Sequence, residues 1–199
     1  MNVVIISTGF SNLSSIYWSI KRIGYNPIIS SDSKIIKNSS KLILPGVGTP
    51  SFVMKYLHEK NLVHIIQDYK RPLLGICLGM QLFFRHSEES QGIHMLDILS
   101  KSCIYKLQAI KSVLPHIGWN KVYFKKKNPL FKDISNGEWF YFIHSYASLI
   151  NSFTISKTYY EQFFSSSIQY NNFFGVQFHP EKSGLSGMIL LKNFLEIKI

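Results

Sequence analysis

Four short apolar segments, separated by segments with helical spacing, restrict what the first half of this chain can fold into. The apolar segments are residues 3–6, 27–29, 41–44 and 72–76. After the first of them, apolar residues at 13, 16, 17, 20 and 23 repeat with the period of a helix. Strands that alternate with helices form parallel sheets with helices on both faces. The first half therefore predicts a parallel sheet between two helical layers.

The second half is richer in aromatic residues and in extended patterns. Strands are predicted at residues 122–124, 139–143, 153–156, 163–168 and 173–178, and a closing helix at 185–197. Two more helices are expected earlier, one capped by Ser51 and running toward Ile66, the other from Met80 to Arg85. The chain has 199 residues and no repeat or Pro/Gly/Ser-rich linker. We predict one three-layer α/β domain over residues 1–199, with a mixed, largely parallel central sheet.

The composition argues against several classes of protein. Hydrophobic residues make up 46% and charged residues 17%, which is incompatible with a disordered chain. The longest apolar runs, such as residues 3–6 and 139–143, are far shorter than the roughly 20 residues that span a bilayer. The N-terminus lacks the basic region of a signal peptide, and two cysteines, Cys77 and Cys103, form no disulfide framework. We expect a cytoplasmic protein that does not bind membranes.

The positive charge is distributed too evenly to indicate a nucleic-acid partner. Lys and Arg total 22 against 11 Asp and Glu, a net charge of +11. Such a balance suits nucleic acids, but the densest basic run is only residues 125–127, and no arginine-rich helix or zinc-finger spacing occurs. The histidines also lack metal-ligand spacing. We therefore predict no nucleic-acid partner, no metal and no cofactor.

A cysteine between two glycines follows the fourth apolar segment. The order is a strand, then Gly75-x-Cys77-x-Gly79, then a helix, which is the pattern of a nucleophile elbow with Cys in place of Ser. The helix N-terminus favours a thiolate and offers a backbone N–H to an oxyanion. Taken alone, the pattern fits a buried core cysteine equally well.

A histidine and a glutamate follow the last predicted strand. His179 and Glu181 are two residues apart, so in an extended segment they point to the same side, and Pro180 stiffens the link. A carboxylate there can hold one imidazole nitrogen and leave the other for a thiol, which needs a base. Alone, this segment could be a surface turn. Combined with the elbow, it predicts a Cys77, His179 and Glu181 triad.

A glycine-containing turn, Pro45-Gly46-Val47-Gly48, follows the third apolar segment. Two glycines let the backbone approach a ligand and direct N–H groups at it, as an oxyanion site requires. The turn lacks the Gly-Lys-Ser/Thr ending of a nucleotide P-loop.

Taken together, these motifs resemble those of the class I (triad) glutamine amidotransferases. The resemblance rests on residues 75–81 and 175–183. The segments 45–48, 115–120 and 141–146 are similar to those of the HisH glutaminase subunits of imidazole glycerol phosphate synthase. The resemblance covers essentially the whole chain, and it implies a flavodoxin-like three-layer fold.

The resemblance implies roles for individual residues. Cys77 attacks the side-chain amide of glutamine, His179 serves as general base and acid, and Glu181 orients His179. Other positions follow from the same resemblance: oxyanion donors at Leu78 and at the peptide between Val47 and Gly48, contacts to glutamine from Gln81, Glu89, Ser145 and Tyr146, and a partner interface at Asn12, Trp119 and Lys182.

The implied function is that of a glutaminase in a heterodimer with a HisF-type cyclase. Glutamine is hydrolysed through a Cys thioester, and the ammonia passes to the cyclase, which makes imidazole glycerol phosphate and AICAR in histidine biosynthesis. One alternative is a paralogous amidotransferase that supplies a sugar-modifying synthetase in surface polysaccharide assembly. A second is a catalytically inactive binding subunit.

Overall fold

The central sheet carries the catalytic candidates at one end. The computed structural model describes residues 1–9, 13–124 and 127–198. Within these residues the largest sheet has seven strands in the order β11-β12-β13-β4-β3-β1-β2. Five of them run parallel: β1 (Val3–Ile6), β2 (Pro27–Ser30), β3 (Lys41–Leu44), β4 (Leu73–Ile76) and β13 (Phe173–Val176). The strands β12 (Gln162–Tyr170) and β11 (Thr154–Tyr160) extend the sheet antiparallel at one edge.

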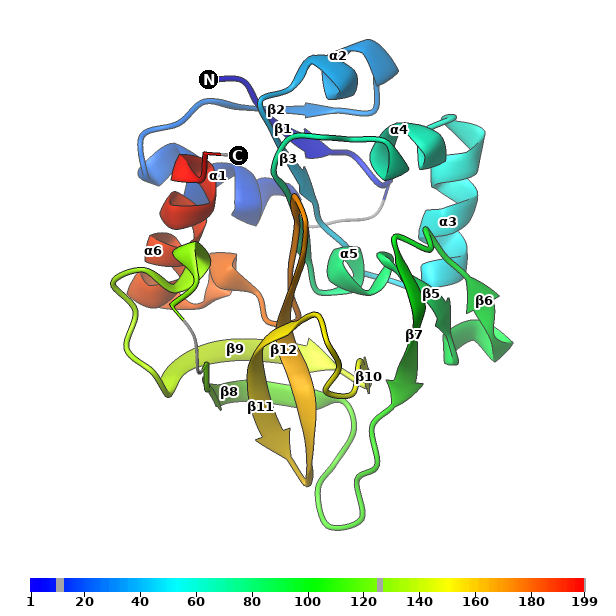
Figure 1. Ribbon diagram of the computed structural model, residues 1–199, viewed down its shortest axis with the longest axis vertical. Coiled ribbons are helices and arrows are strands. Elements are labelled where there is room, and N and C mark those ends of the chain that lie inside the picture. The colour runs from blue at the N-terminus through cyan, green and yellow to red at the C-terminus, as the bar shows by residue number, and fades with distance from the viewer. Residues whose placement is uncertain (10–12, 125–126, 199) are drawn as a thin grey trace.

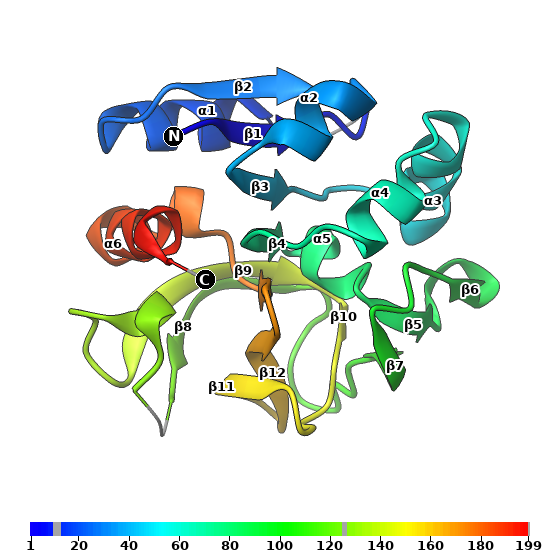
Figure 2. The same ribbon diagram turned by 45° about the horizontal axis from the view of Figure 1, so that its top comes forward.

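Helices cover both faces of this sheet (Figures 1 and 2). The helices α1 (Leu13–Arg22) and α6 (Gly184–Glu196) pack on one face. The other face is covered by α2 (Ser33–Asn38), α3 (Pro50–Glu59), α4 (Val63–Gln67) and α5 (Leu78–Gln81). A hydrophobic core lies on each face of the sheet. Successive residues of a strand point into opposite cores, so Val4 and Ile6 are buried on one face and Val3 and Ile5 on the other. The three-layer α/β fold with a mixed, largely parallel sheet is confirmed.

Two smaller sheets flank the carboxyl ends of the central strands. One consists of β5 (Phe84–Ser87), β6 (Ile93–His94), β7 (Leu99–Lys106) and β10 (Tyr146–Ala147). The other is a ribbon of β8 (His116–Val122) and β9 (Glu138–His144), which lies across the lower part of the molecule in Figure 1. The ribbon buries Phe140 and Phe142 in the same core as the apolar residues of α6 and exposes its outer face. Short 3₁₀ turns are η1 (Glu89–Gln91), η2 (Pro129–Phe131) and η3 (Pro180–Lys182).

The helix predicted to start at Ser51 differs from the structure. It begins at Pro50, after an extended Thr49, because proline is favoured at the first helical position. The helix ends at Glu59, where Asn61 takes a positive φ of 55° and turns the chain before α4. The single helix toward Ile66 is therefore two helices.

The helix predicted from Met80 to Arg85 is confirmed at Met80 and Gln81 and is wrong beyond them. The helix α5 ends at Gln81, and Phe84 already pairs with Leu99 of β7. Phe84 is buried and Arg85 is exposed, which is the alternation of a strand. The pairing partner β7 was not predicted, nor were α2 and β6, and β8 lies mostly before the predicted segment 122–124.

The catalytic candidates meet because the parallel strands end at the same edge. The residues that follow β3, β4 and β13 are Pro45, Cys77 and Gln177. Loops at the carboxyl ends of such strands form the usual ligand site of α/β sheets. Within the described residues, each helix is too short or too polar to cross a membrane.

Direct backbone packing joins α5 to the end of β3. A Cβ atom added to Gly79 lies 1.8 Å from the carbonyl oxygen of Leu44. The first turn of α5 therefore rests on the strand with no room for a side chain. This contact fixes the position of the residue that precedes α5, which is Cys77.

The first prediction tests this packing. Gly79→Ala forces the backbone of α5 away from β3, and we expect a loss of at least about 3 kcal/mol of unfolding free energy, the upper range for overpacking. Gly24→Ala is the control, because Gly24 has a positive φ of 92° but no atom within 4 Å of the added Cβ. That control should lose only about 1–2 kcal/mol. Equal losses in urea titrations of the two variants contradict the steric argument.

Candidate active site

Cys77 lies on a strained turn between β4 and α5. Its φ is 53° and its ψ is −112°, a region that residues with a side chain rarely adopt. The turn is held by hydrogen bonds from Cys77 N to Val176 O at 2.8 Å and from Met80 N to Cys77 O at 3.0 Å. The strain at Cys77 is therefore maintained by the strand beside it and the helix after it.

The glycines near Cys77 allow backbone atoms of neighbouring segments to approach one another closely. A Cβ added to Gly75 lies 2.6 Å from Gly79 O, and one added to Gly46 lies 2.5 Å from Gly79 N. None of these three glycines has a positive φ, whereas Cys77 does. The turn therefore needs glycines because the backbone segments are too close together for a side chain. The strained backbone conformation itself is taken by the cysteine.

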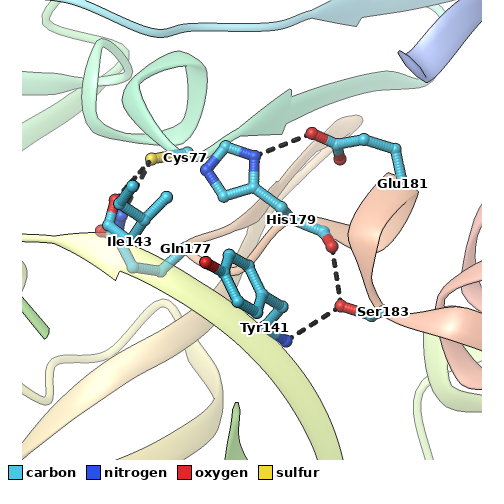
Figure 3. A network of polar contacts seen from close by, with 7 residues as sticks. All are labelled: Cys77, Tyr141, Ile143, Gln177, His179, Glu181 and Ser183. Atoms are coloured by element: carbon cyan, nitrogen blue, oxygen red, sulfur yellow. Dashed lines mark hydrogen bonds and ion pairs between the residues drawn. The ribbon is translucent and has the colours of Figure 1, made fainter. Parts of the chain in front are cut away.

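The structure brings Cys77, His179 and Glu181 together (Figure 3). His179 Nδ1 lies 2.8 Å from Glu181 Oε1, and both side chains are almost fully buried. The other ring nitrogen, Nε2, is on the side of the ring that faces the Cys77 sulfur. Among the described residues, Nε2 has no hydrogen-bond partner in good geometry. The imidazole is thus held from behind by a carboxylate and is open toward the thiol.

The charge of the site favours a protonated His179. Burial lowers its pKa, but the negative charge of the Cys77 sulfur and the carboxylate of Glu181 outweigh that effect and raise the pKa from 6.5 to about 10. A buried pair of opposite charges interacts strongly because water screens it little. The site therefore favours the protonated, imidazolium form of His179.

Ser183 and Tyr141 together hold the backbone of His179. Its hydroxyl donates to His179 O at 2.7 Å and accepts from Tyr141 N at 3.0 Å. His179 N in turn donates to Tyr141 O at 2.9 Å. The histidine is consequently tied to the middle of β9.

A cavity of about 280 Å³ opens beside the Cys77 sulfur. Most of the predicted site residues line it: Val47, Gly48, Cys77, Leu78, Gln81, Glu89, Ser145, Tyr146 and His179. Two larger hollows, of about 730 and 440 Å³, contain none of the predicted site residues. In the described part of the chain, no group of three His, Cys, Asp or Glu residues is placed to hold a metal.

Gln81 lies under the cavity with its amide nitrogen already engaged. Gln81 Nε2 donates to Tyr146 O at 2.9 Å and to Gln177 Oε1 at 3.0 Å, and the residue is 3% exposed. Its amide nitrogen therefore supports the wall of the cavity.

Glu89 is the carboxylate at the cavity mouth. It opens η1 and is half-buried, and burial raises its pKa above the usual value. A positively charged ligand group beside it offsets the desolvation of the carboxylate.

Two of the predicted interface residues, Trp119 and Lys182, lie outside the cavity. Trp119 is 53% exposed, and its ring meets Tyr141 edge-on at 6.1 Å. Lys182 Nζ lies 5.7 Å from the centre of the same Tyr141 ring. The two residues therefore meet around Tyr141, whereas Asn12 lies outside the described residues.

Two contacts to the nucleophile were not predicted. Gln177 Nε2 lies 3.6 Å from Cys77 Sγ, and that sulfur lies 3.8 Å from Ile143 O (Figure 3). The spacing of two between Gln177 and His179 was the available signal, because alternate residues of an extended segment share a side. Nothing local marks Ile143, which reaches the site through the pairing of β8 with β9.

This geometry places a thiol beside a histidine and a carboxylate at the end of an α/β sheet. Residues 4–197 match the model of the family described as glutamine amidotransferase class-I. The chain belongs to this family, and its full-length relatives extend the assignment to the HisH group.

Two of these relatives illustrate the match. The chain is 49% identical to imidazole glycerol phosphate synthase subunit HisH of Buchnera aphidicola subsp. Schizaphis graminum, over 99% of this chain and 100% of the relative. The protein of the same name from Salmonella typhimurium is 48% identical with the same coverage.

Solved structures show the same fold at low identity. A glutamine amidotransferase from Thermotoga maritima superposes with a TM-score of 0.66 at 16% identity, over 98% of this chain and 81% of that chain. The glutaminase domain of Trypanosoma brucei CTPS has a TM-score of 0.64 at 13% identity, over 100% of this chain and 95% of that chain.

The second prediction concerns the charge on His179. Glu181→Gln removes a negative charge that stabilises the imidazolium, so the pKa of His179 should fall from about 10 by about one unit or more. NMR titration of the ring nitrogens measures this shift directly. Glu196→Gln, which removes a carboxylate 3.9 Å from Lys192 on the exposed face of α6, is the control and should leave the titration unchanged. An unshifted His179 in Glu181→Gln refutes the electrostatic role.

Proposed function

We propose that this chain hydrolyses glutamine to glutamate and ammonia as the glutaminase subunit of an imidazole glycerol phosphate synthase. The observation that carries the proposal is the buried contact of His179 with Glu181, beside Cys77 on its strained turn. We base the identity of the substrate and of the synthase on the membership of the chain in the HisH group.

In the first half of the reaction, Cys77 Sγ attacks the side-chain amide carbon of glutamine. The carbonyl oxygen becomes an oxyanion, which backbone N–H groups of Leu78 and of the peptide between Val47 and Gly48 stabilise. Both segments line the cavity, and Gly46 packs directly against the first turn of α5, which supports a shared oxyanion site. His179 gives its proton to the departing nitrogen, so ammonia leaves and a glutamyl thioester remains.

In the second half, water replaces the thioester bond. The now neutral His179 takes a proton from water, the hydroxyl adds to the thioester carbon, and the thiolate leaves. Glutamate departs, and the site returns to a thiolate beside an imidazolium. Glu181 retains its charge throughout and holds the ring in position.

The remaining predicted contacts orient the substrate. Glu89 faces the ammonium group of glutamine, and Ser145 and Tyr146 form the wall along its head group. The half-buried carboxylate of Glu89 and the cavity volume of about 280 Å³ support a small zwitterionic substrate.

A partner protein follows from the role of the relatives, which are named as subunits of a synthase. We propose that the partner is a HisF-type cyclase, which receives the ammonia, and that it binds the outer face of the ribbon of β8 and β9. On this face Ile117 pairs with Ile143, and Trp119 with Tyr141. Exposed apolar residues gathered on one face are typical of an interface.

A small hollow beside His179 supports a route for ammonia past Lys182. It has a volume of about 30 Å³ and shares Gly46, Val47 and His179 with the substrate cavity. Its other lining residues include Glu181 and Lys182. Lys182 therefore stands where ammonia released beside His179 reaches the surface.

The two curated relatives from Buchnera and Salmonella are both named HisH, so they give the alternative in surface polysaccharide assembly no support. A cytoplasmic location stays a prediction.

The third prediction tests the nucleophile. Cys77→Ala should reduce glutamine hydrolysis about a thousandfold or more, because no other thiol can form the thioester. Cys103→Ala is the control, since Cys103 lies on β7 away from the cavity, and it should be nearly silent. Comparable rates in Cys77→Ala and the wild type, with both folded, contradict the proposed mechanism.

The fourth prediction concerns the partner. Gly48 has a positive φ of 94°, and a glycine adopts positive and negative φ about equally readily, so the peptide between Val47 and Gly48 has access to a second orientation. An oxyanion donor that points away in the resting chain slows hydrolysis about a hundred- to a thousandfold. We therefore expect slow glutaminase activity in the isolated chain and a rise when the cyclase and its phosphorylated ligand are both added. Full activity without them refutes this gating.

A further inference from the structure

Two buried histidines face each other across the ribbon of β8 and β9. His116 and His144 are directly paired in the strand register and are 3% and 6% exposed. His116 Nδ1 lies 3.0 Å from His144 Nε2, and His144 Nδ1 lies 2.9 Å from Tyr146 O. At the outer end, Asn120 Nδ2 lies 3.2 Å from His116 Nε2. The sequence pattern alone indicates only packing or loop residues here.

The position of every proton in this row follows from the carbonyl at its end. Burial lowers the pKa of His144 to about 3 and that of His116 to about 4, so each ring is neutral and carries one N–H. Because Tyr146 O can only accept, His144 must carry its proton on Nδ1. His144 Nε2 then accepts from His116 Nδ1, and His116 Nε2 accepts from the Asn120 amide.

The same carbonyl joins the row to the nucleophile. Tyr146 O also accepts from Gln81 Nε2, which donates to Gln177 Oε1 as well. Gln177 Nε2 in turn lies 3.6 Å from Cys77 Sγ, at the end of the network drawn in Figure 3. A continuous row of polar contacts therefore runs from Asn120 on the ribbon to the reacting sulfur.

We propose that His144 and His116 are positioning residues of the glutaminase. His144 directs one N–H at Tyr146 O and so fixes the cavity wall formed by Ser145 and Tyr146, and His116 holds His144 in the tautomer that can do so. The inference rests on the proposed function, because the wall matters only if glutamine binds there.

The chemistry of the surroundings favours this role over packing. The His116 ring stacks between Phe142 at 5.0 Å and Tyr160 at 4.1 Å, an environment that a phenylalanine fills equally well. Polar groups buried among aromatic rings are unfavourable unless all their hydrogen bonds are made. Here both rings are satisfied, and the last acceptor of the row is a backbone atom of the substrate cavity.

The test is a pair of substitutions at each histidine in the full chain, assayed with its synthase partner at saturation. His144→Phe keeps a flat ring but removes the donor, so the KM for glutamine should rise about tenfold, with a smaller change in kcat. His144→Asn places an amide N–H near the position of Nδ1, and it should restore KM to near the wild-type value.

The same pair of substitutions tests His116. His116→Phe should raise KM as His144→Phe does, and His116→Asn, which keeps a donor toward His144, should restore KM. His94→Phe, on exposed β6, is the control.

Two further measurements separate positioning from loss of structure. Alkylation of Cys77 by iodoacetamide does not use the glutamine wall, so its rate should be unchanged in all folded variants. In the wild type, ¹⁵N NMR should show both His116 and His144 with the proton on Nδ1, a readout that needs no variant to fold.

The outcomes are distinguishable. A His144→Phe enzyme with an unchanged KM, an equal slowing of Cys77 alkylation and hydrolysis, or a His144 protonated on Nε2 overturns the inference. An inactive wild-type chain with its partner present instead refutes the proposed function.

Discussion

The close contact between Gly79 and the carbonyl of Leu44 is the constraint on which the candidate site depends. It sets α5 directly on the end of β3, and the chain between β4 and α5 then has to turn sharply at Cys77. Because Gly46 meets the same turn of the helix, the turn at residues 45–48 is held beside the sulfur. These two backbone contacts of Gly79 thereby place both the nucleophile and the candidate oxyanion loop.

Electrostatic interactions set the charge of His179, whose position is fixed by packing. His179 arrives from β13, the strand beside β4, and Glu181 holds its ring from η3. Burial alone lowers the pKa of an imidazole, yet this one is raised because a sulfur and a carboxylate lie on its two sides. The low dielectric of the site strengthens both attractions. The ribbon of β8 and β9 adds a third support, through Tyr141 and Ser183 to His179 and through its two histidines to the cavity wall.

Sequence patterns failed where pairing decided the structure. Residues 84–85 directly follow a predicted helical segment and include an apolar phenylalanine, so a helix was predicted there. In the structure this segment pairs with β7 and is a strand. Asn61 breaks the helix expected to reach Ile66, because asparagine tolerates a positive φ that no periodicity reveals. Gln177 and Ile143 reach Cys77 from 100 and 66 residues away in the chain; the spacing of Gln177 to His179 was a signal for the first, but no spacing marks Ile143.

The sequence by itself determined the fold class and the candidate nucleophile, base and orienting carboxylate, because these depend on local order: apolar strands alternating with helices, a cysteine between glycines, and a histidine two residues before a glutamate. Only the tertiary structure decided how these groups act on one another. The strain at Cys77 and the raised pKa of His179 depend on contacts between segments far apart in the chain, and the row of His116 and His144 depends on the pairing of β8 with β9. Such contacts depend on burial and on the direction of individual hydrogen bonds, and neither quantity is encoded in residue spacing.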